Sequence, residues 1–399
     1  MALGVLLSLN AYVIASNTMS ASESERGELS YIMENIYSLI DFEALCMIAE
    51  RREMNFSDNT VSKIKRVYDF NDYTYFIIEF SPCGYAIYDN DFTQLLEFNA
   101  RAQSPYLNYD DGLIYAGATQ YYIKSIKSGQ NSNLTSAKQF DIDAAVYTHS
   151  VLGTEIVMDD DTKIFLKEQS ANMAEAIESK KNTISMLEDS YSINAAEATE
   201  YYASLRNYTS ITNANTTGFN TSGNCGYVAA SLIVWYHYDV LGWSDFVPGG
   251  RYTISLVEDI QGDRADSTYG PDIQNALSWW SYSHGAVAEN RWQETLPALC
   301  DLLPASESIY NLIDDDRPVI VLGLVPENPR DFTGIAGTYM GRSANEKVDH
   351  AITVTGVVKV VNSAINVDYN YYAHYGWGTA YNDVYISESV ITKGAAVYY

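Results

Sequence analysis

One segment indicates both the fold and the chemistry of this chain: Ser222-Gly223-Asn224-Cys225-Gly226-Tyr227-Val228-Ala229-Ala230-Ser231. A polar loop leads here to a cysteine at the first position of an apolar helix, which the spacing predicts over residues 225–241. Backbone N–H groups and the positive end of the helix dipole meet at such a position, and both favour the nucleophilic thiolate. The alternative is a small buried cysteine at a helix start, and the segment alone does not separate the two.

A cysteine nucleophile needs a base, usually histidine, and the chain has only five: His149, His237, His284, His350 and His374. His350 follows the polar loop 343–349 and opens a strand predicted at 351–361, so its ring would be held rigidly. We interpret His350 as the base; the alternative is a capping or surface histidine. His237 falls inside the Cys225 helix and cannot easily face back to the thiol.

A third element, His374-Tyr375-Gly376-Trp377-Gly378, ends a tyrosine-rich strand predicted at 370–374. Two glycines allow a tight turn around Trp377 and lay its indole over a neighbour. An indole in that place shields the base from water and strengthens an ion pair. The alternative is an ordinary aromatic turn in a tyrosine-rich protein.

In order and spacing, three motifs resemble those of papain-like cysteine peptidases, and most closely the streptopain-like branch of secreted bacterial peptidases: Asn224-Cys225-Gly226, Asp349-His350-Ala351-Ile352 and the turn 374–378. The resemblance covers roughly residues 205–399. It implies a papain-like α+β domain in which the nucleophile helix packs on an antiparallel sheet. It also implies peptide hydrolysis through a thioester, with a polypeptide substrate and no metal or organic cofactor.

The resemblance assigns two further roles. The family's asparagine that orients the catalytic histidine aligns with His374, which can accept a hydrogen bond from His350 in the right tautomer. The family's oxyanion glutamine aligns with Phe219, but Asn220, one residue closer to Cys225, could donate through its amide. Otherwise the oxyanion hole consists of the Cys225 N–H and another donor. The predicted catalytic set is therefore Cys225, His350, His374 and Asn220.

The N-terminal part changes character along its length. Residues 17–67 and 164–201 show helical spacing, whereas residues 68–124 are rich in aromatic and β-branched residues and predict a small antiparallel sheet. We expect four segments: a signal-peptide-like stretch at 1–16, an α+β propeptide-like domain at 17–124, a linker and helical segment at 125–204, and the peptidase domain at 205–399. The resemblance implies a zymogen whose own propeptide blocks the site until it is cleaved.

The first 16 residues are apolar and end in small residues, as in a secretory signal, but they lack a basic start. The alternative is a buried first helix. A signal would place the protein outside the cell or at the cell surface. No other stretch reaches the roughly 18 apolar residues of a membrane span, so we expect none in the mature protein.

The composition of the chain argues against several classes of function and site. With 47% hydrophobic and 19% charged residues, the 399-residue chain has a globular balance. A net charge of -27 repels phosphate backbones, which argues against nucleic acid as a partner. Cys46, Cys83, Cys225 and Cys300 are too scattered for a zinc site or a disulfide scaffold, although one pair could bridge.

Two other functions stay open at this point. One is a different acyl-transfer enzyme on the same scaffold, with transglutaminase-like, amidase or sortase-like activity. The other is a catalytically degenerate secreted binding protein. Reactivity of the Cys225 thiol separates the binding protein from both enzymes, and the acyl acceptor separates the enzymes from each other.

Overall fold

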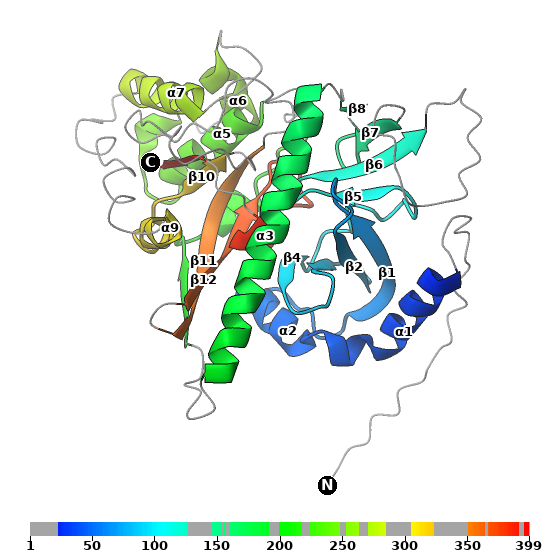
Figure 1. The fold of residues 1–399 in the computed structure, drawn as a ribbon. Coiled ribbons are helices and arrows are strands. Elements are labelled where there is room, and N and C mark those ends of the chain that lie inside the picture. The colour runs from blue at the N-terminus through cyan, green and yellow to red at the C-terminus, as the bar shows by residue number, and fades with distance from the viewer. Residues whose placement is uncertain are drawn as a thin grey trace.

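One large sheet runs through both halves of the chain and is the framework of a mixed α+β fold (Figure 1). The computed structural model describes residues 23–126, 145–153, 155–156, 160–190, 199–217, 224–247, 253–262, 270–284, 305–322, 350–363, 366–390 and 395–398. The predicted signal-like stretch at 1–16 lies outside these ranges.

The path through the sheet is β14-β10-β11-β12-β13-β4-β3-β2-β1-β5-β6-β7-β8, with β9 paired to β11 beside it. All neighbouring strands are antiparallel except β1 and β5. The strands are β1 (Thr60–Tyr68), β2 (Thr74–Ser81), β3 (Tyr85–Tyr88), β4 (Leu95–Asn99), β5 (Leu113–Tyr115), β6 (Tyr121–Ile126), β7 (Ala145–His149), β8 (Glu155–Ile156), β9 (Thr199–Ser204), β10 (Val319–Leu322), β11 (Ala351–Ser363), β12 (Asn366–His374), β13 (Val384–Ser387) and β14 (Ala395–Tyr398).

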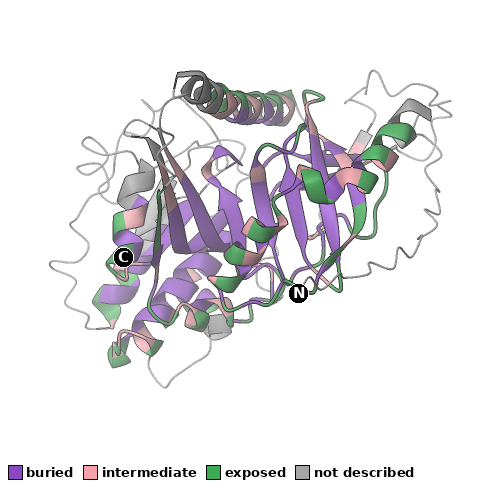
Figure 2. Cartoon of the chain, turned by 90° about the horizontal axis from the view of Figure 1, so that it is seen from below, coloured by how far each residue is buried: buried purple, intermediate pink, exposed green. Residues whose placement is uncertain are grey.

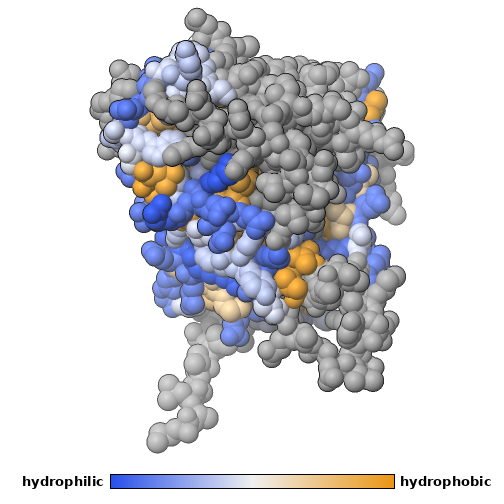
Figure 3. Space-filling model, turned by 90° about the vertical axis from the view of Figure 1, so that its left-hand side faces the viewer, coloured by the Kyte–Doolittle hydropathy of each residue, from blue (hydrophilic) through white to orange (hydrophobic). Residues whose placement is uncertain are grey.

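The helices lie around this sheet (Figure 1). They are α1 (Glu23–Leu39), α2 (Phe42–Glu50), α3 (Asp160–Ser190), α4 (Thr209–Thr212), α5 (Cys225–Asp239), α6 (Thr253–Gln261), α7 (Gly270–Ser283) and α9 (Ala305–Asp314), with short 3₁₀ turns η2 (Ser244–Phe246) and η6 (Glu388–Val390). Figure 2 shows that most strand residues are buried, whereas many exposed residues lie on the helices and loops. Strand β9 and the first half of β1 are more exposed than the other strands. On the face in Figure 3, the described residues are mostly hydrophilic, with small separate hydrophobic groups.

Helix α5 begins at Cys225, as predicted, and almost all of its residues are buried. One side packs on the sheet through Ile320 of β10 and Ala351 of β11, and the other packs on α6 and α7. A helix that is apolar on all sides is stable only inside a core. The position of Cys225 is therefore set by packing on both sides of its helix.

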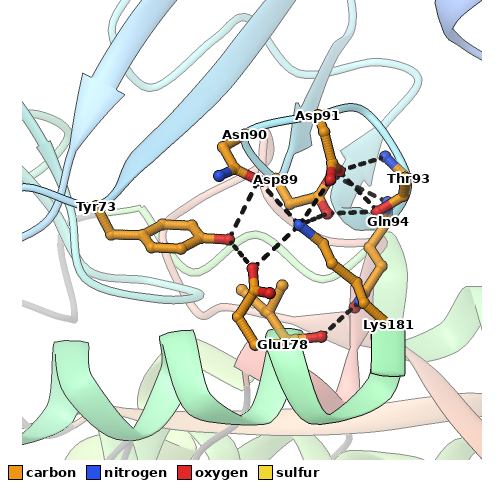
Figure 4. Close-up of polar contacts among 9 residues, drawn as sticks. Tyr73, Asp89, Asn90, Asp91, Thr93, Gln94, Glu178 and Lys181 are labelled. Atoms are coloured by element: carbon orange, nitrogen blue, oxygen red, sulfur yellow. Dashed lines mark hydrogen bonds and ion pairs between the residues drawn. The ribbon is translucent and has the colours of Figure 1, made fainter. Parts of the chain in front are cut away.

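Helix α3 crosses one face of the sheet (Figure 1). Leu166, Met173 and Ile177 lie on its buried side, at helical spacing. Near its C-terminal end, the Lys181 ammonium contacts oxygens of Asp89, Asn90, Asp91 and Glu178 at 2.9–3.2 Å (Figure 4). We call this group the Lys181 cage; it attaches α3 to the turn between β3 and β4.

The predicted strands at 351–361 and 370–374 are confirmed as β11 and β12, and strands within 68–124 are confirmed as β2 to β6. These last strands form no small sheet of their own, because they belong to the one large sheet, in which β5 runs parallel to β1. Two helix predictions were wrong in part. Residues 60–67 belong to strand β1, in which Lys65 is buried and paired with Glu79. Residues 199–201 belong to β9, because pairing with β11 outweighs the local helical preference.

Candidate active site

Cys225 is the first residue of α5 and is buried. It is a thiol, as are Cys46 and Cys83, the other cysteines in the described ranges. The preceding Asn224 makes no side-chain capping bond to the helix. Cys225 belongs to the same buried cluster as Ala351, the first residue of β11. The start of the helix and the start of the strand are thus packed into one core.

His350 immediately precedes Ala351 and is also buried. Its Nε2 lies 2.5 Å from the carbonyl oxygen of Tyr375. Because a carbonyl oxygen can only accept, Nε2 carries the proton and donates it. No hydrogen bond to Nδ1 is present among the described residues. In the neutral ring Nδ1 therefore holds an unshared electron pair, as a general base requires.

Trp377 covers the His350 ring, with centroids 5.0 Å apart and planes tilted by 41°. Its turn is formed by two glycines with positive φ, Gly376 and Gly378. A Cβ at Gly378 would lie 2.7 Å from the Thr217 hydroxyl, so only glycine fits there. The Gly378 N–H also donates to Thr216 Oγ1 at 2.9 Å. The turn is in this way attached to the segment that leads toward Cys225.

His374 is the last residue of β12, directly before this turn, and its hydrogen bonds go to the backbone. The Gly376 N–H donates to Nδ1 at 2.8 Å, and Nε2 faces the Ala214 carbonyl at 3.5 Å. The atom that holds Nε2 of His350 is the carbonyl oxygen of Tyr375, the residue after His374. No sequence signal marks such a carbonyl, because every residue carries one. Asn220, the predicted oxyanion donor, lies outside the described residues.

His149 of β7 also contacts Trp377, with ring centroids 5.1 Å apart. Both of its nitrogens are engaged: Nε2 with the Thr119 carbonyl, and Nδ1 with the backbone N–H groups of Val151 and Leu152. A part of the chain that precedes the predicted peptidase domain thus packs against the indole over His350. Sequence order gave no reason to connect these two histidines.

Burial makes all three histidines of this region poor proton acceptors. It lowers the pKa of His350 to about 4, although the Tyr375 carbonyl favours the protonated ring. The pKa values of His149 and His374 are lowered to about 4 for the same reason. At pH 7 the His350 ring is neutral in this arrangement. The observed form therefore lacks the imidazolium of a thiolate–imidazolium pair.

Behind the turn lies a second buried ionisable group. The Glu97 carboxyl of β4 accepts hydrogen bonds from Tyr85 at 2.6 Å, from Tyr121, and from Tyr115 at 3.4 Å. The Tyr375 hydroxyl faces the same carboxyl without a hydrogen bond of normal geometry. Burial raises the pKa of Glu97 to about 7 against the effect of these phenols. Tyr375 thus connects this group, through its own backbone, with His350.

Within the described ranges, no group of three or more His, Cys, Asp or Glu side chains could hold a metal ion. Of the helices that these ranges contain, none is both long and apolar enough to cross a membrane. No protein-family model, no curated protein and no solved structure matches the chain.

Proposed function

We propose that the chain is a secreted or cell-surface cysteine peptidase of papain-like architecture, made as a zymogen. The observation that carries the proposal is one shared buried cluster. Cys225, the first residue of a buried helix, and Ala351, the residue after His350, both belong to it. The Tyr375 carbonyl supports the assignment of His350 as base, because it selects the tautomer that leaves Nδ1 as a proton acceptor.

In the proposed reaction, Nδ1 of His350 takes the proton of the Cys225 thiol, and Sγ attacks the carbonyl carbon of an extended polypeptide. The negative oxygen is held by the Cys225 N–H together with the Asn220 amide. His350 then gives its proton to the leaving amine, and water hydrolyses the thioester to release the acid and restore the thiol. The sequence of steps needs no other reactant.

The zymogen part of the proposal is supported by the cover over the site. His149 and Tyr121, both from the N-terminal half, contact Trp377. A buried, neutral His350 cannot stabilise a thiolate by charge, so activity requires that this cover moves. We expect access of water and substrate to raise the pKa of His350 toward its ordinary value of 6.5.

The test is covalent labelling by an epoxide that reacts with activated cysteines, applied before and after limited proteolysis near residue 200. We expect Cys225 to be labelled only after processing, and labelling to be lost in Cys225→Ala and reduced at least 100-fold in His350→Ala. Cys83→Ala is the matched control and should be labelled like the natural chain, because Cys83 lies far from the site in sequence and contacts the Ala100 carbonyl.

Two outcomes would redirect the proposal. A folded protein that is not labelled in either form would contradict the enzyme and favour a secreted binding protein. Labelling of Cys225 together with transfer of the acyl group to an amine, in preference to water, would favour a transglutaminase-like or sortase-like enzyme.

A further inference from the structure

The two halves of the chain meet in a strand pair that we call the seam. Strand β4 of the N-terminal half pairs antiparallel with β13 of the C-terminal half, with Phe98 opposite Tyr385 and Glu97 opposite Ile386. The β1–β4 meander and the β10–β13 strands are therefore parts of one sheet (Figure 1). Separation of the halves would leave two open edges that carry unpaired backbone groups.

Apolar packing also crosses the seam. The buried cluster of α1, α2 and β1–β4 includes Val358, Tyr372 and Tyr385 from the C-terminal half. Tyrosine hydroxyls connect the halves as well, since Tyr372 donates to the Ile48 carbonyl and Tyr381 donates to the Gln103 carbonyl, each at 3.0 Å. Removal of residues 23–126 would expose large side chains that are now buried.

Arg52 is the strongest polar link. Its side chain is 1% exposed and binds the Asp383 carboxylate through contacts of 2.8 and 2.9 Å. Its remaining N–H groups donate to the hydroxyls of Thr355 at 2.7 Å and of Tyr202 and Ser204 at 3.1 Å. All of these acceptors follow residue 198. Without Arg52, the buried Asp383 carboxylate would lose its hydrogen-bonded counter-ion and keep only the weaker electrostatic effect of Arg101, which is strongly unfavourable.

The guanidinium also stacks on aromatic rings. It lies 3.5 Å from the centre of the Tyr208 ring and 4.7 Å from that of Tyr372. Such contacts are favourable when both groups are removed from water. The aromatic rings, the hydrogen-bond acceptors and the carboxylate that contact the Arg52 guanidinium thus all belong to the C-terminal half.

From these contacts we infer that residues 23–126 remain bound to residues 199–398 after any cleavage between Ser190 and Thr199, so that the processed protein is a stable two-chain molecule. The regulatory meaning of this inference rests on the proposed function, but the association itself does not. In the two-chain molecule, the contacts of His149 and Tyr121 with Trp377 must be relieved by movement of β7 and β6, neither of which is part of the seam. The N-terminal half then serves as a permanent partner and not as a discarded inhibitor.

The experiment places a recognition sequence for a specific protease between Ser190 and Thr199 of the full chain. After complete cleavage, size-exclusion chromatography with light scattering is run in 0.15 M and 1 M NaCl. We expect both fragments to elute together as a one-to-one complex at both salt concentrations, because the contacts of the seam are buried and weakly screened. A C-terminal fragment that elutes alone as a folded monomer would overturn the inference.

A matched pair of variants tests whether Arg52 holds the two fragments together. Arg52→Met in the cut protein should raise the dissociation constant of the fragments by roughly 100-fold or more. Arg51→Met should change it by less than about 5-fold, because Arg51 pairs with the half-exposed Glu200. Equal effects of the two variants would refute the role of Arg52.

A milder change covers the case in which Arg52→Met does not fold. Tyr372→Phe removes only the hydroxyl that donates to Ile48 across the seam, and should weaken association several-fold. No effect of this variant, with fragments that separate readily in the natural sequence, would contradict the inference. Association is measured without any peptidase assay, so failure to label Cys225 refutes the proposed enzyme and leaves this result untouched.

Discussion

The seam contains two buried carboxyl groups that are accommodated in opposite ways. Asp383 faces the Arg52 guanidinium in a bidentate ion pair. Burial opposes the charge on Arg52, but the Asp383 carboxylate outweighs it and raises the pKa of the guanidinium. Glu97 has phenol hydroxyls around it and no cation among its described hydrogen-bond partners. Burial raises the pKa of Asp383, and Arg52 opposes that rise. One region of the seam therefore holds a charge pair, and the other holds an acid that is half-ionised near neutral pH.

Because of this difference, we expect the two regions to respond differently to pH. The Arg52 region stabilises the seam at any pH at which Asp383 is ionised. The Glu97 region stabilises it most when the carboxyl is protonated, because burial of the carboxylate is costly. The Lys181 cage is a third case, in which one cation contacts several oxygens, from the buried Asp89 to the half-exposed Asp91 (Figure 4).

The largest effect on the uncut chain is expected from Arg52→Met. Loss of one partner leaves Asp383 buried and unpaired, which lowers the free energy of unfolding by about 3–5 kcal/mol. Arg51→Met, which breaks the more exposed pair with Glu200, should cost less than about 1 kcal/mol. Urea denaturation of both variants and the natural chain measures this. Similar losses of unfolding free energy for the two variants would show that the buried ion pair stabilises the chain no more than the exposed one.

The next effect is a pH dependence that Glu97→Gln removes. The pKa of Glu97 is about 7 when folded and 4.5 ordinarily. Between these values the folded chain binds one more proton than the unfolded chain, so stability from this group is present below pH 4.5 and is lost as pH rises through 7. The loss is about 3 kcal/mol in total.

Unfolding curves at pH 5, 6, 7 and 8 check this prediction as a difference between the natural chain and Glu97→Gln. Glu79→Gln is the control, since Glu79 is buried beside the Lys65 ammonium instead of phenols. A difference curve for Glu97→Gln that is flat from pH 5 to 8 would show that Glu97 stays ionised, and the contrast with Asp383 would disappear.

The smallest of the three effects is expected at the Lys181 cage. Lys181→Met removes the cation from the fully buried Asp89 and should lower the free energy of unfolding by about 1–3 kcal/mol. Lys180→Met breaks one ion pair, with Asp368, and should cost less than Lys181→Met, because Lys181 contacts the oxygens of four residues. Thermal unfolding at 0.05 and 0.5 M NaCl measures both variants. If Lys180→Met costs more, α3 is held chiefly by the C-terminal sheet and not by the cage.

Much of the local structure could be predicted from the sequence. The apolar spacing after Cys225 predicted a helix that begins at that residue, and the β-branched run after His350 predicted strand β11. These predictions held because both segments are buried in a core, where apolar patterning and burial agree. Residues 199–201 were predicted as helix, although they form a strand because they pair with the distant β11. Residues 60–67 were also predicted as helix, although they form a hairpin with the neighbouring β2.

The residues of the candidate site could be predicted from the sequence, but the contacts among them could not. Cys225, His350 and the Gly-Trp-Gly turn were selected from the sequence, and the indole of Trp377 does lie over His350. The partner of His350 was expected to be the His374 side chain, whereas the structure places the Tyr375 carbonyl at Nε2. A backbone acceptor is positioned by the strand and the turn, so no residue type in the sequence indicates where it lies.

By itself, the sequence determined which segments are apolar, where a cysteine meets a helix start and which histidine opens a core strand, because these properties are local. Only the tertiary structure decided that β4 pairs with β13, that Arg52 reaches Asp383 and that His149 packs on Trp377. Each of these contacts joins residues far apart in the chain. Their formation depends on shape, desolvation and the closure of long loops, which act on the folded molecule as a whole.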